Sequence, residues 1–426
     1  MSKDNLNIDE GLAPITQSER MSWQSIAMIQ AGICVCVPAF LLGALLSDEM
    51  NFWPAVISGT LGYIIAIVVM CITGVIGSDL GVTSCVMAEG AFGKKGARYI
   101  VSTLFAINML GWFGIQNKIT GDIIGNFLLE QMGINISPII LTIICGAVML
   151  VTAVYGIKAL DKLNKISIPL LMITMILGLY LAMQMYDTSA ILAETEQTMS
   201  FWSGVALSFN FYAVGTVTSA DFTRYQKSRK DTLLSTIFGV LPMGVITLVI
   251  SIILTRIANE YDISIVLMNV GIPVIGIISM ILSTWTTNST NAYAAGISSI
   301  MILGQPDSKR KVVTVLVGGI AVLLGAFGIF DSVESVLSSL AFIVCPIGGV
   351  VIADYWVLGK GKPENFNPVE GFKITAIITW IVSGVISYVL GIEYIGIVVA
   401  FIIFLVLEKA VNKKMTFKGE LDENVN

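Results

Sequence analysis

AGICVCVP, at residues 31–38, interrupts the first long apolar segment of the chain with Gly32 and the helix-breaking Pro38. Proline lacks a backbone N–H and clashes with the turn before it, so a helix usually kinks or breaks there. A second apolar segment, FNFYAVGTVTSADF at residues 209–222, carries polar residues and has Gly215 at its centre. These two interrupted segments are the pattern from which we infer the organisation of the whole chain.

The composition around these segments is that of a membrane protein. The chain has 426 residues, of which 55% are hydrophobic and 12% are charged, whereas a soluble domain is about 25% charged. Apolar runs of about 20 residues recur along the whole length, and each can span a bilayer as a helix. We therefore expect an all-α protein that crosses the lipid bilayer many times. The first 20 residues are polar, so we expect no cleavable signal peptide.

Hydropathy predicts twelve transmembrane helices joined by short connections, in a single domain. The expected ranges are 22–46, 54–78, 97–126, 137–156, 165–186, 203–221, 232–257, 271–300, 312–330, 333–358, 372–391 and 393–409.

The positions of the basic residues predict the orientation of these helices. Of the 24 Lys and Arg residues, all but Lys118 and Arg256 fall in the two tails or in alternate connections, on one side of the expected membrane. Because Lys and Arg collect on the cytoplasmic side of a membrane, we expect both termini to be cytoplasmic. We expect the membrane itself to be the plasma membrane. The opposite connections carry acids, namely Asp48, Glu49, Asp187, Glu194, Asp331 and Glu334.

The two interrupted segments occupy matching positions if the chain is built from two inverted halves. Membrane proteins with such halves bind small solutes near the bilayer midplane, where discontinuous helices meet. We expect a cytoplasmic tail at 1–21, a transmembrane domain at 22–410 with repeats at about 22–186 and 203–358, peripheral helices at about 372–409, and a cytoplasmic tail at 411–426. Gly and Pro are also common in ordinary membrane helices, so composition alone does not decide whether these interruptions have a function.

The inventory of reactive side chains argues against an enzyme. Histidine is absent, which excludes a His-based catalytic triad and histidine-ligated metal chemistry. The six cysteines are scattered in apolar segments without paired spacing, and we interpret them as small buried hydrophobic residues. We expect no cofactor and no nucleic-acid partner. A membrane-embedded sensor is the rival from another class, but only the short tails offer an output surface.

The run STWTTNSTNAY, residues 283–293, is unusually polar for the interior of a membrane helix. Hydroxyl and amide groups at that depth must face protein or water. One interpretation is that they join neighbouring helices by hydrogen bonds. The other is a site for a hard cation, because Thr hydroxyls and the carbonyls of an unwound helix supply oxygen ligands without a formal charge.

Five motifs resemble the nucleobase–cation symporter family, and within it most closely the cytosine and purine permeases. They are GWFGIQ (111–116), YGIKALDKLNKISIP (155–169), SADFTRY (219–225), WTTN (285–288) and GGVVIADYW (348–356), in the family's order and spacing. The resemblance implies a leucine-transporter-like fold with a 5+5 inverted repeat plus two peripheral helices. It also implies a monomer that takes up a small heterocycle by alternating access, coupled to sodium or protons, with sodium preferred.

The resemblance also implies positions for the site. The family sandwiches a flat ring between two aromatic residues, here Trp112 and either Tyr212 or Phe211. Gln116 lies four residues after Trp112, on the same helical face, and its amide can hydrogen bond to a heterocycle edge. Further candidate substrate contacts are Gly215, Asn288 and Asn291. Sodium ligands carry over to the carbonyls of Ala31 and Cys34, to Ser283 and to the hydroxyls of Thr286 and Thr287.

The chain departs from the cytosine permeases around these motifs. Gln116, Asn117 and Lys118 replace small or apolar residues, and Ser289, Thr290 and Asn291 stand where an acid and an amide are usual. Cytosine, a purine, a hydantoin and a hydroxymethylpyrimidine therefore all stay open as substrates. For Lys118 we favour a structural ion pair with Asp122, four residues on, over a cationic group that adjusts coupling.

Overall fold

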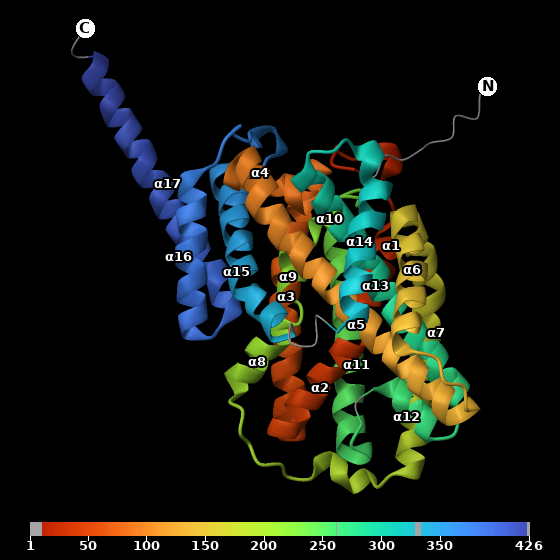
Figure 1. Cartoon of the computed structure of the whole chain (residues 1–426). Helices are drawn as coiled ribbons and strands as arrows, with labels where there is room; N and C mark the ends of the chain where they lie inside the picture. Colours follow the sequence, from red (N-terminus) through yellow and green to blue (C-terminus); the bar gives the residue numbers. More distant parts are fainter. Residues whose placement is uncertain (1–10, 261, 329–333, 424–426) are drawn as a thin grey trace.

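The computed structural model describes residues 11–260, 262–328 and 334–423, and within them the regular structure is helical (Figure 1). An isolated bridge pairs Met21 with Gln226. The α-helices are α1 (Trp23–Cys34), α2 (Val37–Glu49), α3 (Phe52–Leu80), α4 (Ser84–Gly96), α5 (Ser102–Met132), α6 (Pro138–Tyr155), α7 (Ile157–Met185), α8 (Phe201–Asn210), α9 (Ala213–Thr218), α10 (Ala220–Thr223), α11 (Arg229–Ala258), α12 (Ile263–Asn269), α13 (Pro273–Leu303), α14 (Arg310–Ala326), α15 (Glu334–Ile352), α16 (Ile374–Leu390) and α17 (Glu393–Glu423).

Short helices of other kinds join or extend these elements. Two π-helical segments continue longer helices, η2 (Ala97–Val101) before α5 and η5 (Ala353–Leu358) after α15. Four 3-10 turns lie in the connections, η1 (Gln17–Glu19), η3 (Thr188–Leu192), η4 (Asp307–Lys309) and η6 (Pro363–Asn365).

Helical structure occupies each of the twelve ranges expected from hydropathy, with 329–333 outside the described residues. The expectation that every connection is short is wrong at two places. Helix α4, which hydropathy missed because it carries Glu89, Lys94 and Lys95, joins α3 to α5, and α12 precedes α13. Helix α7 also begins at Ile157, so Lys158, Lys162 and Lys165 lie in its first turns instead of in a loop.

Both interrupted segments are broken helices. Helix α1 ends at Cys34, and α2 starts at Val37 with Pro38 in its first turn; the two axes are bent by 54°. In the second segment α8 ends at Asn210 and α9 begins at Ala213. The break therefore lies at Phe211 and Tyr212, before Gly215, which is an ordinary helical residue of α9. Each break exposes backbone groups that lack an intrahelical partner.

In the described part of the chain, seven helical stretches are long and apolar enough to cross a membrane, or eight if α1 and α2 form one bent span. These seven are Phe52–Leu80, Ser84–Met132, Pro138–Tyr155, Ile157–Met185, Arg229–Ala258, Ser339–Leu358 and Glu393–Val411. Helix α16 is apolar but shorter. The chain is thus a helical protein that passes the membrane several times.

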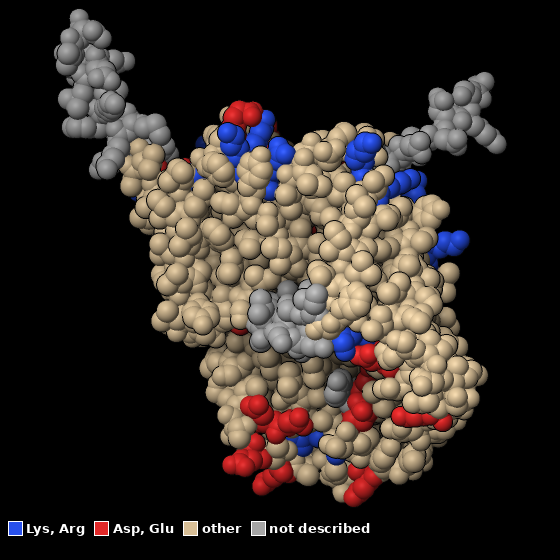
Figure 2. Space-filling view, in the orientation of Figure 1, with Lys and Arg blue, Asp and Glu red and all other residues tan. Residues whose placement is uncertain are grey.

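Charge is distributed between the two ends of the molecule much as the sequence predicts. Figure 2 shows Lys and Arg mainly at the end near α4 and α14, and Asp and Glu mainly at the end near α2, α8 and α12. The exceptional Arg256 lies at the acidic end, where it donates to the carbonyls of Ala193 and Met50 over 2.8 and 2.6 Å. Lys3, Asp331 and the side chains of Glu334, Lys413, Lys414 and Lys418 lie outside the described residues.

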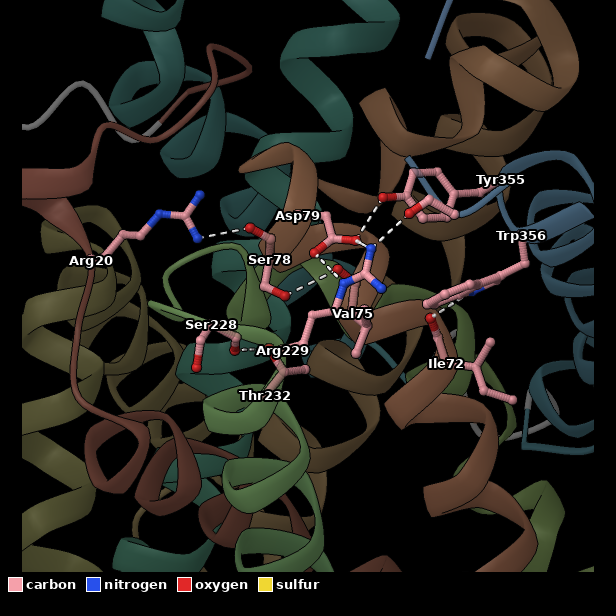
Figure 3. A network of polar contacts seen from close by, with 11 residues as sticks. Arg20, Ile72, Val75, Ser78, Asp79, Ser228, Arg229, Thr232, Tyr355 and Trp356 are labelled. Atoms are coloured by element: carbon pink, nitrogen blue, oxygen red, sulfur yellow. Dashed lines mark hydrogen bonds and ion pairs between the residues drawn. The ribbon is translucent and has the colours of Figure 1, made fainter. Parts of the chain in front are cut away.

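A polar network ties helices together at the basic end (Figure 3). Arg229, in the first turn of α11, binds both carboxylate oxygens of Asp79 in α3, with N···O distances of 2.9 and 2.7 Å. The hydroxyl of Tyr355, in η5, donates to the same carboxylate over 2.6 Å. From the N-terminal segment, Arg20 donates to the carbonyls of Ser78 and Gln226. The basic ends of α3, α11 and η5 are thereby held together.

Candidate substrate and cation site

A cavity of about 150 Å³ lies where the two broken helices face α5 and α13. Its walls are formed by residues at both breaks and by residues of α1, α2, α3, α5, α8, α9, α10, α11, α13 and α15. Of the residues expected from sequence to contact a substrate, Trp112, Gln116, Phe211, Tyr212, Gly215 and Asn291 line it.

Aromatic rings form part of this wall. Trp112 of α5 and Phe211, the residue directly after α8, are both half-buried at the cavity. Tyr212 is more enclosed, because its hydroxyl donates to the sulfur of Cys34 over 2.6 Å and its ring packs edge-on against Tyr63, with centroids 5.4 Å apart. Trp112 and Phe211 are therefore the more accessible surfaces for a flat ring.

Amide side chains form the polar part of the wall. Asn108, Trp112 and Gln116 follow each other at intervals of four along α5, so one helical face presents all three. The Gln116 carbonyl oxygen and the Asn108 amide nitrogen are buried without a hydrogen-bond partner. The carbonyl oxygen of Gln30, from α1, also lines the cavity and is unpartnered. Buried polar groups of this kind favour a ligand that completes their hydrogen bonds.

Gln30 and Asn108 are absent from the expected site. Asn108 could have been found, because it stands one turn before Trp112 on the same face as Gln116. Gln30 gives no comparable signal, since its position depends on the packing of α1 against distant helices.

Asn288 lies elsewhere than its neighbour Asn291. It is fully buried and is not part of the cavity wall; its amide nitrogen donates to the carbonyl of Phe113 in α5 over 3.1 Å. Asn291 lines the cavity and donates to the Asn288 carbonyl oxygen over 3.4 Å. Asn288 thus joins α13 to α5 and positions Asn291.

A cluster of neutral oxygens lies between α1 and α13. The hydroxyls of Thr286 and Thr287 donate to the Gly32 carbonyl over 3.3 and 2.9 Å, and to the Ser283 carbonyl over 2.9 and 3.2 Å. The Ser283 hydroxyl instead donates to Met280 of its own helix. Ala31 and Cys34 are buried in the last turn of α1, where carbonyls lose their intrahelical donors.

These uncharged oxygen atoms are suitable ligands for a hard cation. Among the described residues there is no group of three or more His, Cys, Asp or Glu side chains that could hold a metal ion. Hydroxyl and carbonyl oxygens can hold sodium, and they are the groups at this cluster. Thr287 also lines the cavity, so an ion bound here would adjoin a bound substrate.

Lys118 does not line the cavity. Its ammonium lies 2.7 Å from Asp122, one turn further along α5, and both side chains are partly exposed. The predicted structural ion pair is confirmed.

Comparison with known proteins relates most of this chain to a family of permeases. The family described as permeases for cytosine/purines, uracil, thiamine and allantoin matches residues 14–410. A cytosine permease of Escherichia coli (strain K12) is 26% identical over 369 residues, covering 86% of this chain and 84% of that protein. A purine-uracil permease of Arabidopsis thaliana is 24% identical over 429 residues, covering 90% and 71%.

A solved structure has the same fold. Mhp1, described as a nucleobase-cation-symport-1 family transporter, in a closed conformation with bromovinylhydantoin bound, superposes with a TM-score of 0.83 at 19% identity and 96% coverage of both chains.

Proposed function

The chain belongs to the family of permeases for cytosine, purines, uracil, thiamine and allantoin, and from this we propose that it takes up a small single-ring heterocycle together with sodium. It is a transporter of the bilayer and not an enzyme, since its relatives are permeases. The observation that carries the proposal is the cavity, in which accessible aromatic rings stand beside unpartnered amide atoms.

The size of the cavity favours one ring over two. A cavity of about 150 Å³ is comparable to an engineered protein cavity that binds benzene. Cytosine, uracil, hydantoin and hydroxymethylpyrimidine each have one ring. A purine has two fused rings and would require the walls to move apart. Of the alternatives, we therefore place the purines behind the single-ring compounds.

The polar atoms narrow the chemistry further. The free carbonyl oxygens of Gln30 and Gln116 require N–H donors, and the free amide nitrogen of Asn108 requires an acceptor. A ring with two N–H groups and a carbonyl or ring nitrogen meets all three requirements. Cytosine fits through its ring N–H and its amino group. A site of this kind discriminates strongly against analogues that leave its polar groups unpaired.

Sodium is the proposed coupling ion, held by the carbonyls of Ala31, Cys34 and Ser283 and the hydroxyls of Thr286 and Thr287. The broken end of α1 and the polar run of α13 support this set. An ion there would join α1 to α13 beside the substrate, and alternating access would follow from rearrangement of the two halves around the site.

For the arrangement in the membrane we propose twelve crossings and a monomer with both termini cytoplasmic. The matching broken helices support inverted repeats at about 22–186 and 203–358, with α16 and α17 as peripheral helices. The distribution of Lys and Arg supports the orientation (Figure 2).

Binding to purified protein tests the function. A thermal-stability panel of cytosine, uracil, hydantoin, hydroxymethylpyrimidine and adenine, each with sodium or choline, should give a shift for a single-ring compound that is larger with sodium. Uptake of that compound into proteoliposomes should then require a sodium gradient. Uptake driven by pH and indifferent to sodium would contradict sodium coupling and favour protons, with Lys118, Asp122 and Asp221 as the first residues to test. A ligand-dependent signal without uptake would favour a sensor.

A further inference from the structure

Asn164 is a fully buried residue of α7 that neither site accounts for. It lies in the motif YGIKALDKLNKISIP (155–169). Its amide nitrogen donates to the Leu160 carbonyl over 2.8 Å, one turn back along the same helix. Its carbonyl oxygen has no hydrogen-bond partner.

The free oxygen of Asn164 lies against the broken helix at the cation cluster. A Cβ atom built on Gly32 would stand 1.8 Å from this oxygen and 3.2 Å from the Cβ of Thr286. Only a residue without a side chain allows Asn164 to approach α1 so closely. Gly32 is also the residue whose carbonyl accepts from Thr286 and Thr287. Three helices, α1, α7 and α13, therefore meet at Gly32.

Burial makes an unpartnered oxygen at this point unfavourable by itself. A carbonyl oxygen removed from water loses its hydrogen bonds, and native proteins rarely leave such an atom unsatisfied without a bound water, an ion or a functional role. The neighbouring groups at Gly32 and Thr286 are themselves acceptors or already donate to carbonyls. A cation would satisfy the oxygens of all three helices together.

We propose that the Asn164 carbonyl oxygen is a further ligand of the cation, supplied by α7. This rests on the proposed sodium site between α1 and α13. It extends that site to a third helix, so that the bound ion links α7 as well as α13 to the broken end of α1. It also gives the 155–169 motif a direct part in cation binding.

Two substitutions separate the oxygen from the volume of the side chain. Asn164→Leu keeps a similar size and removes the oxygen, whereas Asn164→Asp keeps an oxygen at the same position. The matched control is Asn117→Leu, because Asn117 is also fully buried with an unpartnered amide, on α5 and outside the cavity wall. Sodium affinity is measured without substrate, from the rise of the thermal midpoint with sodium concentration at constant ionic strength in choline.

We expect Asn164→Leu to weaken sodium binding by at least about tenfold, the size of effect seen when groups supporting a metal site are removed. Asn164→Asp should bind sodium at least as well as the unaltered chain at pH 8, and Asn117→Leu should bind it normally. Equal sodium affinity in Asn164→Leu and Asn117→Leu would overturn the role of Asn164, and so would equal weakening by leucine and aspartate.

Failure of the sodium site itself gives a different result. If the unaltered chain shows no sodium-dependent midpoint, both this inference and sodium coupling are wrong. If the unaltered chain shows a sodium-dependent midpoint and Asn164→Leu keeps the same dependence, only this inference is wrong. If Asn164→Leu does not fold in choline, the same comparison is made with Asn164→Ala and its control Asn117→Ala.

Discussion

Trp112 stands at the centre of a helical face that has both an aromatic and a polar character. Asn108 lies one turn before it and Gln116 one turn after it, and all three line the cavity. A flat ring stacked on the indole would have its edges within reach of amides above and below. Stacking tolerates any ring, so in the proposed site the indole would provide affinity and the amides selectivity.

Trp112→Ala tests the aromatic contribution. Stacking on an aromatic residue contributes about 1–3 kcal/mol per base, so substrate affinity should fall roughly 5- to 150-fold. The half-buried indole lies at a cavity instead of in the packed core, so the protein should still fold. Affinity is measured by calorimetry, with the thermal midpoint as the folding control. Near-normal affinity in a folded variant would remove Trp112 from the site.

Gln116→Leu tests the polar contribution. The substitution keeps most of the volume but removes the unpartnered carbonyl oxygen, so it should weaken the native substrate by about 1–3 kcal/mol. An analogue that lacks the matching N–H should lose much less. Competition binding with paired analogues measures the difference. Asn117→Leu, one residue further and outside the cavity wall, is the control. Equal losses for both analogues would indicate packing.

At the level of single residues, the sequence predicts which side chains share a face of one helix better than it predicts contacts between different helices. Trp112 and Gln116 share a face by their spacing, and the same rule would have found Asn108. Asn288 stands within one turn of Thr287 and Asn291, both of which line the cavity, yet its own amide bonds to Phe113. That difference is set by the packing of α13 on α5, which no local pattern reveals.

The broken helices are the elements that place the cavity next to the proposed cation site. The break in α1 and α2 follows from Pro38, as expected. The break after α8 does not coincide with Gly215; it lies at Phe211 and Tyr212, which carry no helix-breaking signal. Part of what holds it is distant, since Tyr212 donates to Cys34 at the other break. A contact between residues 178 positions apart is beyond prediction from local sequence.

Tyr212→Phe tests this link between the two breaks. The ring and its contact with Tyr63 remain, but the hydrogen bond to Cys34 is lost, at a cost of about 0.5–1.5 kcal/mol in stability. If the link also positions the last turn of α1, sodium affinity should fall modestly while substrate affinity at saturating sodium is kept. Sodium titrations of the thermal midpoint provide the measurement. If the thermal midpoint in choline is lowered while sodium affinity is unchanged, the Tyr212 hydroxyl contributes to stability alone.

For the whole molecule, hydropathy predicts the helices because membrane helices need long apolar runs, and it misses helices that are short or partly charged. Helix α4 is short and partly charged, so it resembles a connection in sequence. Residues at both breaks line the cavity, whereas the network around Asp79 (Figure 3) joins α3, α11 and η5 at the basic end. In the proposed transport cycle, the helices around the cavity open alternately to either side, and a sodium ion bound with the substrate supplies the energy for directional opening.

Thr287→Ala tests that coupling, because Thr287 contributes to both sites. Its hydroxyl donates to Gly32 and Ser283 in the cation cluster, and the same residue lines the cavity. Loss of the hydroxyl should weaken sodium binding by about 1–3 kcal/mol.

Coupling between sites is reciprocal: if sodium tightens the binding of substrate, substrate must tighten the binding of sodium by the same factor. Substrate affinity in the variant should therefore fall at low sodium and recover at saturating sodium. Titrating substrate at several sodium concentrations, balanced with choline, measures both factors. A loss that saturating sodium leaves unchanged would place the Thr287 hydroxyl in substrate binding alone, and the neutral cage of α1 and α13 would then need another explanation.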